Sequence, residues 1–268
     1  MMSVAGVPSQ PGRHGLAGDR IAAAGGAIDA LMERASQALL RCDYFATIEL
    51  SLRALDKARR SKDFERIARV VLPLQEARRQ VRQLACDAGR AFVWRGLPGR
   101  DTPMEPGLHL LEPPLIGLEG RAFREVARAR KVAALVLVKE PTTSAGKWPI
   151  VGVGLGEFEN VVARVQVDPP PALKENRDKS IAGVPPERLP GVDWFLAALE
   201  AVGDAAIRKV RTSWPAAHRV EDLIEYLDAV PDHEKLAQAL EATAREALAS
   251  PLPINGRRRP AADNPFSF

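Results

Sequence analysis

VAALVLV, residues 132–138, is a nearly continuous apolar run with the length of one buried strand. A run without a polar face needs cover on both sides, so other elements must pack over it. Two further apolar segments follow, at 149–154 and 161–167, and both are bounded by turn-forming residues. This part of the chain therefore predicts a sheet at the centre of the protein.

The segment before this run supplies the rest of the sheet. Residues 91–94 and 108–111 are short strand candidates, and residues 118–130 carry apolar side chains at helical spacing. The predicted order is strand, strand, helix, strand, strand, strand. Residues 89–168 are therefore expected to form a small mixed sheet with one helix on a face.

The segment after the sheet changes from proline-rich to helical. Residues 169–191 contain three consecutive prolines and predict an extended, stiff linker. Residues 192–250 predict three amphipathic helices, with Asp193 capping the first and Asp232 the third. Each of these helices needs a surface to cover, and the sheet and the N-terminal helices are the candidates.

The segment before the sheet, residues 27–88, is helical by its apolar periodicity. A first helix is expected over 27–41. Asp43 and Asp63 are placed to cap the second and third. Pro73 falls inside the third helix and predicts a kink or a division into two helices, because proline removes a helical hydrogen bond.

DYFATIELSLRAL, residues 43–55, resembles the second half of a tetratricopeptide repeat. The matching residues are Tyr44, Ile48, Ala54 and Leu55. The resemblance covers residues 27–88, roughly one and a half repeats, and implies a helical hairpin that docks a protein partner. Since such arrays need about three repeats to stand alone, the hairpin is expected to pack on the rest of the chain or on a partner.

Both ends of the chain predict flexible tails, residues 1–26 and 251–268, because they are rich in glycine, proline and polar residues. The last residues place Phe266 and Phe268 in a polar context. Two such aromatics are suited to fill pockets on a partner, although an unselected terminus explains them equally well.

Charge is distributed unevenly along a chain whose net charge is +4. Residues 53–95 carry an excess of about seven positive charges and residues 219–246 an excess of about five negative ones. This asymmetry either steers a partner or lets the two segments attract each other. The basic segment is a candidate nucleic-acid surface, with a solvated face as the alternative. Candidate contacts for a protein partner are Tyr44, Arg78, Arg79 and Arg82, with a core position as the alternative for Tyr44.

No motif of catalysis, cofactor binding or metal binding is recognised. GVGLG, residues 152–156, is interpreted as a glycine-rich turn, because no helix is expected after it and Glu157 and Glu159 would repel a phosphate. The four histidines lack ligand spacing. Cys42 and Cys86 are interpreted as reduced core thiols.

Composition sets the class of protein. Apolar residues make up 46% and charged residues 27% of 268, enough for a real core. No apolar run of about 18 residues and no secretory signal is recognised, so we expect no membrane partner and a cytoplasmic location. The richness in Ala, Arg and Pro is typical of a GC-rich bacterial genome.

The sequence thus predicts an α+β protein: helical hairpin, small sheet and C-terminal helices. The expected function is that of a non-enzymatic adaptor for protein partners. Two alternatives stay open. One is an RNA- or ribosome-associated protein that uses the basic helices, and the other is an enzyme with a site between the sheet and the C-terminal helices. The oligomeric state is not predicted.

Overall fold

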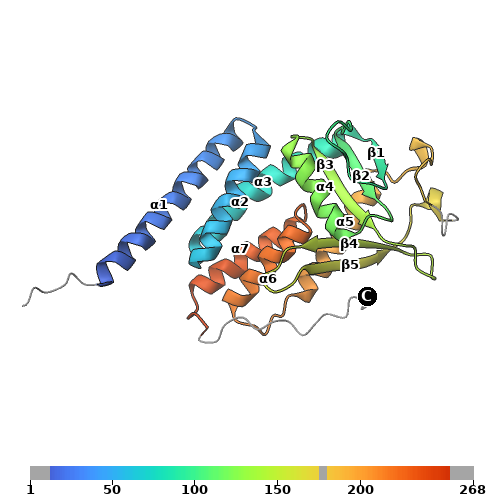
Figure 1. Cartoon of the computed structure of the whole chain (residues 1–268). Coiled ribbons are helices and arrows are strands. Elements are labelled where there is room, and N and C mark those ends of the chain that lie inside the picture. Colours follow the sequence, from blue (N-terminus) through green and yellow to red (C-terminus); the bar gives the residue numbers. More distant parts are fainter. Residues whose placement is uncertain (1–12, 175–179, 254–268) are drawn as a thin grey trace, which may run out of the picture.

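The computed structural model describes residues 13–174 and 180–253 (Figure 1). Within these residues the chain forms seven α-helices, five strands and two short 3₁₀ turns, at 171–173 and 186–188. The helices are α1 (Arg13–Leu40), α2 (Tyr44–Ser61), α3 (Phe64–Ala88), α4 (Gly117–Ala129), α5 (Val192–Lys209), α6 (Ala216–Ala229) and α7 (Glu234–Leu248). The strands are β1 (Ala91–Trp94), β2 (Gly107–Leu111), β3 (Ala134–Lys139), β4 (Trp148–Gly154) and β5 (Val161–Val167).

The sheet has the strand order β1-β2-β3-β4-β5, and the α+β class and the predicted order of elements are confirmed. The first three strands are parallel and the last two antiparallel to their neighbours. β3 and β4 pair only through Val138 with Val151 and Lys139 with Ile150. The start of β3 and the end of β4 therefore diverge, and Figure 1 shows β4 and β5 running at an angle to the other strands.

The two faces of the sheet are covered by different helices, as the apolar run required. Val136 and Val138 of β3 pack with Phe123 of α4 in a small cluster. Leu135 and Leu137, which point to the other face, belong to the main core with α3, α5 and α6. Alternate residues of one strand thus reach two apolar layers, because successive side chains of a strand point to opposite faces.

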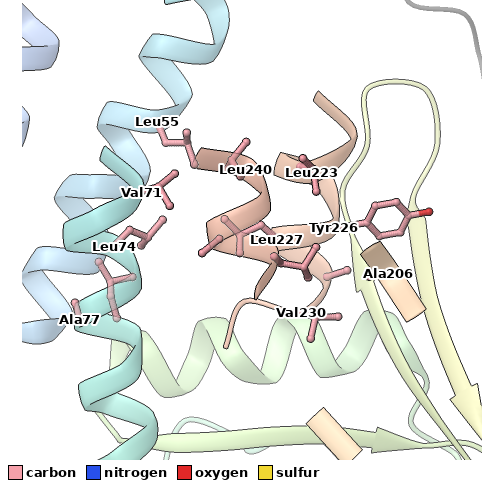
Figure 2. Packing of buried hydrophobic residues seen from close by; sticks show 14 of the residues in the cluster. Leu55, Val71, Leu74, Ala77, Ala206, Leu223, Tyr226, Leu227, Val230 and Leu240 are labelled. Atoms are coloured by element: carbon pink, nitrogen blue, oxygen red, sulfur yellow. The ribbon is translucent and has the colours of Figure 1, made fainter. Parts of the chain in front are cut away.

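The hairpin and the sheet share one core, a point that the sequence left open. α3 packs on α7 and also contacts β2 and β3. Figure 2 shows Val71 and Leu74 of α3 facing Leu227 and Leu240 of the C-terminal helices. The three N-terminal helices therefore pack on the rest of the chain, which is one of the two outcomes that the sequence predicted.

The helix starts agree in part with prediction. Asp43 and Asp63 cap α2 and α3, accepting hydrogen bonds from the backbone N–H groups of Ala46 and Arg66. The two later caps were predicted wrongly. Gly191 precedes α5 and leaves Asp193 inside its first turn, and the His233 side chain caps α7 in place of Asp232.

The start of α1 differs from prediction, and of the two alternatives predicted at Pro73 the division of the helix is excluded. α1 begins at Arg13, so the helix reaches well into the predicted tail 1–26. α3 continues through Pro73 as one helix of 25 residues and is not divided there. Packing on both α2 and α7 compensates for the hydrogen bond that proline removes, since tertiary contacts override local preference.

The linker is packed on the body of the protein rather than extended. Leu173 and Ile181 are fully buried, and short 3₁₀ turns interrupt the chain. The buried Glu112 side chain after β2 accepts hydrogen bonds from Ser180 Oγ and from the backbone N–H of Ile181, the latter at 3.0 Å. The buried Leu173 and Ile181 and the hydrogen bonds to Glu112 thus hold the proline-rich segment against the protein near the end of β2.

The glycines of GVGLG serve strand–helix packing more than a turn. Gly152 and Gly154 lie in β4 under α6, and only Gly156 lies in the turn before β5. A Cβ atom at Gly154 would stand 2.3 Å from the Glu225 carbonyl oxygen, closer than any real contact. As predicted, a strand and not a helix follows these glycines, so the phosphate-loop geometry is absent from this segment.

The two thiols are not both core residues. Cys42 is exposed in the turn between α1 and α2, which corrects the expectation, and Cys86 is partly buried. Both are free. No helix in the part of the chain that the structure describes combines the length and apolar character needed to cross a membrane.

Candidate functional site

A cavity of about 230 Å³ lies where the helical hairpin, α4 and the turn between α6 and α7 meet. The cavity is lined by Phe45, Ile48, Leu52, Arg78, Val81, Arg121, Arg124, Glu125, Ala127, Arg128, Val132, Ala134, Asp228, Pro231 and Asp232. We call this cavity the arginine pocket.

Helix α4 supplies three of the four arginines. Arg121, Arg124 and Arg128 are spaced i, i+3 and i+7, which places them on one face of the helix. The neighbouring face, with Phe123 and Ala127, is buried against the sheet. Burial of that apolar stripe therefore sets the direction in which the arginines point.

Arg78 enters the pocket from α3. Its Nη1 atom is buried and makes no hydrogen bond to any residue of the described chain. Burial lowers the pKa of its guanidinium to about 10, so the group is still protonated at neutral pH. A buried cationic donor without an acceptor costs free energy, and a bound acceptor would remove that cost.

Arg124 lies deep in the same pocket. Its Nη2 donates to the main-chain carbonyl oxygen of Asp228 at 3.1 Å, and burial lowers the pKa of its guanidinium. Within residues 13–174 and 180–253 it forms no ion pair with a carboxylate. Arg121 differs in this respect, because its guanidinium contacts Asp228 at 2.8 Å and Glu125 at 2.6 Å. Arg128 is exposed at the rim.

Among the carboxylates, Asp232 has the largest electrostatic effect on the pKa values of Arg78 and Arg124. Burial raises its pKa, while Arg78, Arg124 and Arg82 act in the opposite direction. Its main-chain carbonyl oxygen accepts a hydrogen bond from Arg82 Nη1 at 2.7 Å, which holds the turn between α6 and α7 against α3. The acid thus partly balances the arginines without forming an ion pair with Arg78.

The chemistry of the lining is suited to anion binding. Among the lining residues in the described chain there is no serine, threonine, cysteine, histidine, lysine or tyrosine. The ionisable groups of the lining are the four arginines and the carboxylates of Glu125, Asp228 and Asp232. Four guanidinium groups are instead suited to hold an anion, because each presents several N–H donors in a fixed plane.

The residues predicted to contact a partner separate in the structure. Arg78 lines the arginine pocket, while the exposed Arg79 pairs with Glu76 at 2.8 Å. Arg82 is partly buried and pairs with Glu234 of α7. Tyr44 is partly buried against the core.

The remaining two predicted residues, Phe266 and Phe268, lie outside the described residues. The arginines of α4 were not predicted. Their i, i+3, i+7 spacing was a readable signal, but nothing in the sequence indicated that Arg78 would face them.

The two charged segments of the chain attract each other. Arg59 contacts Glu221 at 2.5 Å and Glu225 at 3.1 Å, and Arg82 reaches Glu234. Most basic side chains of the predicted nucleic-acid surface have a carboxylate within ion-pair distance: Arg59, Arg60, Arg66, Arg69, Arg79, Arg82 and Arg90. Of these, Arg59 and Arg82 pair with the acidic segment 219–246, and the others pair with acids elsewhere in the chain.

A second polar cluster comprises Glu200, Asp204 and His233. Lys235 already neutralises it, with its ammonium 2.9 Å from Glu200 and 3.2 Å from Asp204. His233 Nδ1 accepts the backbone N–H of Leu236, which leaves the proton on Nε2, the atom that faces the carboxylates. A protonated nitrogen cannot ligate a metal, so the cluster is explained as a helix cap with a local ion pair.

Comparison of the chain with protein-family models, with curated proteins and with solved structures gives no match in any of the three.

Proposed function

We propose that this protein is a non-enzymatic binding protein, an adaptor that captures an anionic group in the arginine pocket. The observation that carries this proposal is Arg78, whose buried Nη1 atom has no acceptor among the described residues. Buried polar groups in folded proteins are almost always hydrogen-bonded, and the exceptions cluster at sites of function. An anion between Arg78 and Arg124 would supply the missing acceptor.

The position of the pocket also supports a binding role. Its lining comes from the hairpin, from α4 and from the turn between α6 and α7. A ligand there would contact three parts of the chain at once. Since a ligand that binds only the folded protein stabilises it, occupancy would tighten the junction of these parts.

The two alternatives have less support from the geometry. An RNA surface needs unpaired positive charge along an exposed face, whereas most arginines of residues 53–95 are in ion pairs. An enzyme with a site between the sheet and the C-terminal helices would need a nucleophile or base, and the only such groups in this lining are the carboxylates of Glu125, Asp228 and Asp232, of which the first two pair with Arg121. The tetratricopeptide resemblance stays a prediction and is compatible with an adaptor.

The proposal is tested by thermal unfolding and calorimetric titration with small anions at constant ionic strength, with sodium chloride as the reference. The panel consists of phosphate, sulfate, acetate, benzoate and hexanoate. We expect at least one anion to bind and to raise the melting temperature, and Arg78→Met to lose this response. Arg79→Met is the matched control, because Arg79 lies on the same helix but outside the pocket. Absence of binding by every anion, or equal binding by Arg78→Met, would overturn the proposal.

A further inference from the structure

We infer that the arginine pocket selects a singly charged carboxylate joined to a small apolar body. This inference rests on the proposed function and specifies the ligand class of the same pocket. It follows from the net charge of the lining, from the apolar side chains that α2 contributes to it, and from the two parallel N–H donors of an arginine guanidinium.

The charge of the lining matches a monoanion. Four arginines face three acids, which are Glu125, Asp228 and Asp232. The lining therefore carries one net positive charge, which one carboxylate would neutralise. A doubly charged phosphate would leave an excess negative charge in a partly buried site beside Asp232, where like charges repel strongly.

The apolar residues come mainly from one helix. α2 contributes Phe45, Ile48 and Leu52 to the lining and contributes no charged residue there. Val81 of α3 and Val132 add to the apolar lining. A ligand with only an anionic head, such as acetate or inorganic phosphate, would leave this surface in contact with water. A short aliphatic or aromatic body would bury it.

The arginines suit a carboxylate head. A guanidinium donates two parallel N–H bonds, which match the two oxygens of a carboxylate. Arg78 has a free donor at Nη1, and Arg124 has no carboxylate partner in the described chain. The head is therefore placed between α3 and α4 and the body toward α2.

The same chemistry occurs in two sources, a free carboxylic acid and the C-terminal carboxylate of a peptide with an apolar last residue. The cavity volume of about 230 Å³ admits only a small group in either case. Hexanoate and 3-phenylpropanoate represent the first source. N-acetyl-alanyl-phenylalanine represents the second, and its C-terminal amide serves as the uncharged control.

The test is calorimetric titration of the full chain with hexanoate, 3-phenylpropanoate, acetate, inorganic phosphate, 1-hexanol and the two peptides. We expect hexanoate to bind roughly tenfold or more tightly than acetate, since each buried CH₂ contributes about fourfold. Hexanol and the peptide amide should not bind measurably. If the peptide acid binds at least as tightly as 3-phenylpropanoate, the ligand is the C-terminus of a peptide. If the peptide acid binds more weakly, the ligand is a free carboxylic acid.

Two variants separate the head from the body. Arg78→Met should abolish binding of hexanoate, and Leu52→Asn should reduce hexanoate affinity to that of acetate while acetate affinity stays unchanged. Circular dichroism and melting temperature verify that both variants fold. Phosphate binding more tightly than hexanoate would overturn this inference but leave the proposed function standing. Absence of binding by every anion would overturn both.

Discussion

The indole Nε1–H of Trp94 donates a hydrogen bond to Nδ1 of His109, with 3.0 Å between the two nitrogens. Because an indole can only donate, Nδ1 must accept and the imidazole proton lies on Nε2. That nitrogen is 3.1 Å from the Glu105 carbonyl oxygen, which accepts from it. Phe92 stacks on the same ring with centroids 5.1 Å apart. The neutral imidazole is thus fully satisfied in a buried site between β1 and β2.

This arrangement predicts a loss of stability in acid. Burial lowers the pKa of His109 to about 4, against 6.5 for the free side chain. Between these values the unfolded chain binds a proton that the folded chain does not, so stability falls as the pH decreases from 6.5 to 4. The full effect is about 3 kcal/mol. Urea unfolding at several pH values should show this slope, and His109→Gln should reduce it by nearly one proton. An unchanged slope in the variant would contradict the assignment.

A methyl group at Gly154 should disrupt the contact between β4 and α6. Gly154→Ala places Cβ 2.3 Å from the Glu225 carbonyl oxygen and 2.7 Å from the Ala229 backbone nitrogen, so backbone must move. We expect a loss of about 3 kcal/mol or more in the free energy of unfolding. Gly26→Ala is the control, because its Cβ meets nothing within 4 Å and alanine favours the helix by about 1 kcal/mol. Similar effects of the two substitutions on urea unfolding would refute the packing argument.

Glu112 should control how tightly the segment 169–191 is held. Its carboxylate accepts the backbone N–H groups of Ile181 at 3.0 Å and Ala182 at 3.3 Å. Glu112→Ala should therefore free this segment and lower the free energy of unfolding by about 2–3 kcal/mol. Limited digestion with trypsin should then cleave after Lys174 at least several times faster. Glu105→Ala, at an exposed carboxylate, should leave the cleavage rate unchanged.

The ion pair between Arg82 and Glu234 should couple the hairpin to the C-terminal helices. Arg82 is 17% exposed and also donates to the Asp232 carbonyl oxygen. A double-mutant cycle with alanine at both positions should give a coupling free energy of about 1 kcal/mol or more. The exposed i,i+4 pair of Arg60 and Asp56 is the control and should give about 0.5 kcal/mol or less. Equal coupling free energies would mean that the pair between α3 and α7 contributes no more to stability than an exposed surface ion pair.

Removal of the unpaired cation should not harm the empty protein. Arg78→Met replaces a buried, unpartnered guanidinium with an apolar side chain of similar length. Such replacements are neutral or stabilising, and we expect a gain of about 1 kcal/mol in the free energy of unfolding without ligand. Differential scanning calorimetry in chloride buffer checks this. A loss of more than about 2 kcal/mol would show that Arg78 has a structural partner, and would weaken the argument for a ligand.

Local patterns predicted most of the elements. The apolar run at 132–138, the alternation around it and the acidic caps Asp43 and Asp63 depend on neighbouring residues only, and the structure agrees with them. The errors occurred where distant contacts compete with local preference. The prolines of 169–191 do not keep that segment extended, because Leu173 and Ile181 within it are buried.

The candidate site was predicted only in fragments. Arg78 was singled out as a surface contact, and the stripe of Arg121, Arg124 and Arg128 was overlooked. Their meeting depends on how α3 and α4 pack against the sheet, which no spacing along the chain reveals.

The sequence by itself determined the α+β class, the order of the elements and the opposite charges of residues 53–95 and 219–246, because periodicity and charge are properties of short stretches. Only the tertiary structure decided which charges neutralise each other. Packing of α3 on α7 brings Arg82 to Glu234, whereas Arg78, four residues earlier on the same helix, turns toward α4 and finds no carboxylate. Whether a buried arginine is paired depends on the elements packed around it, and that arrangement exists only once the core has formed.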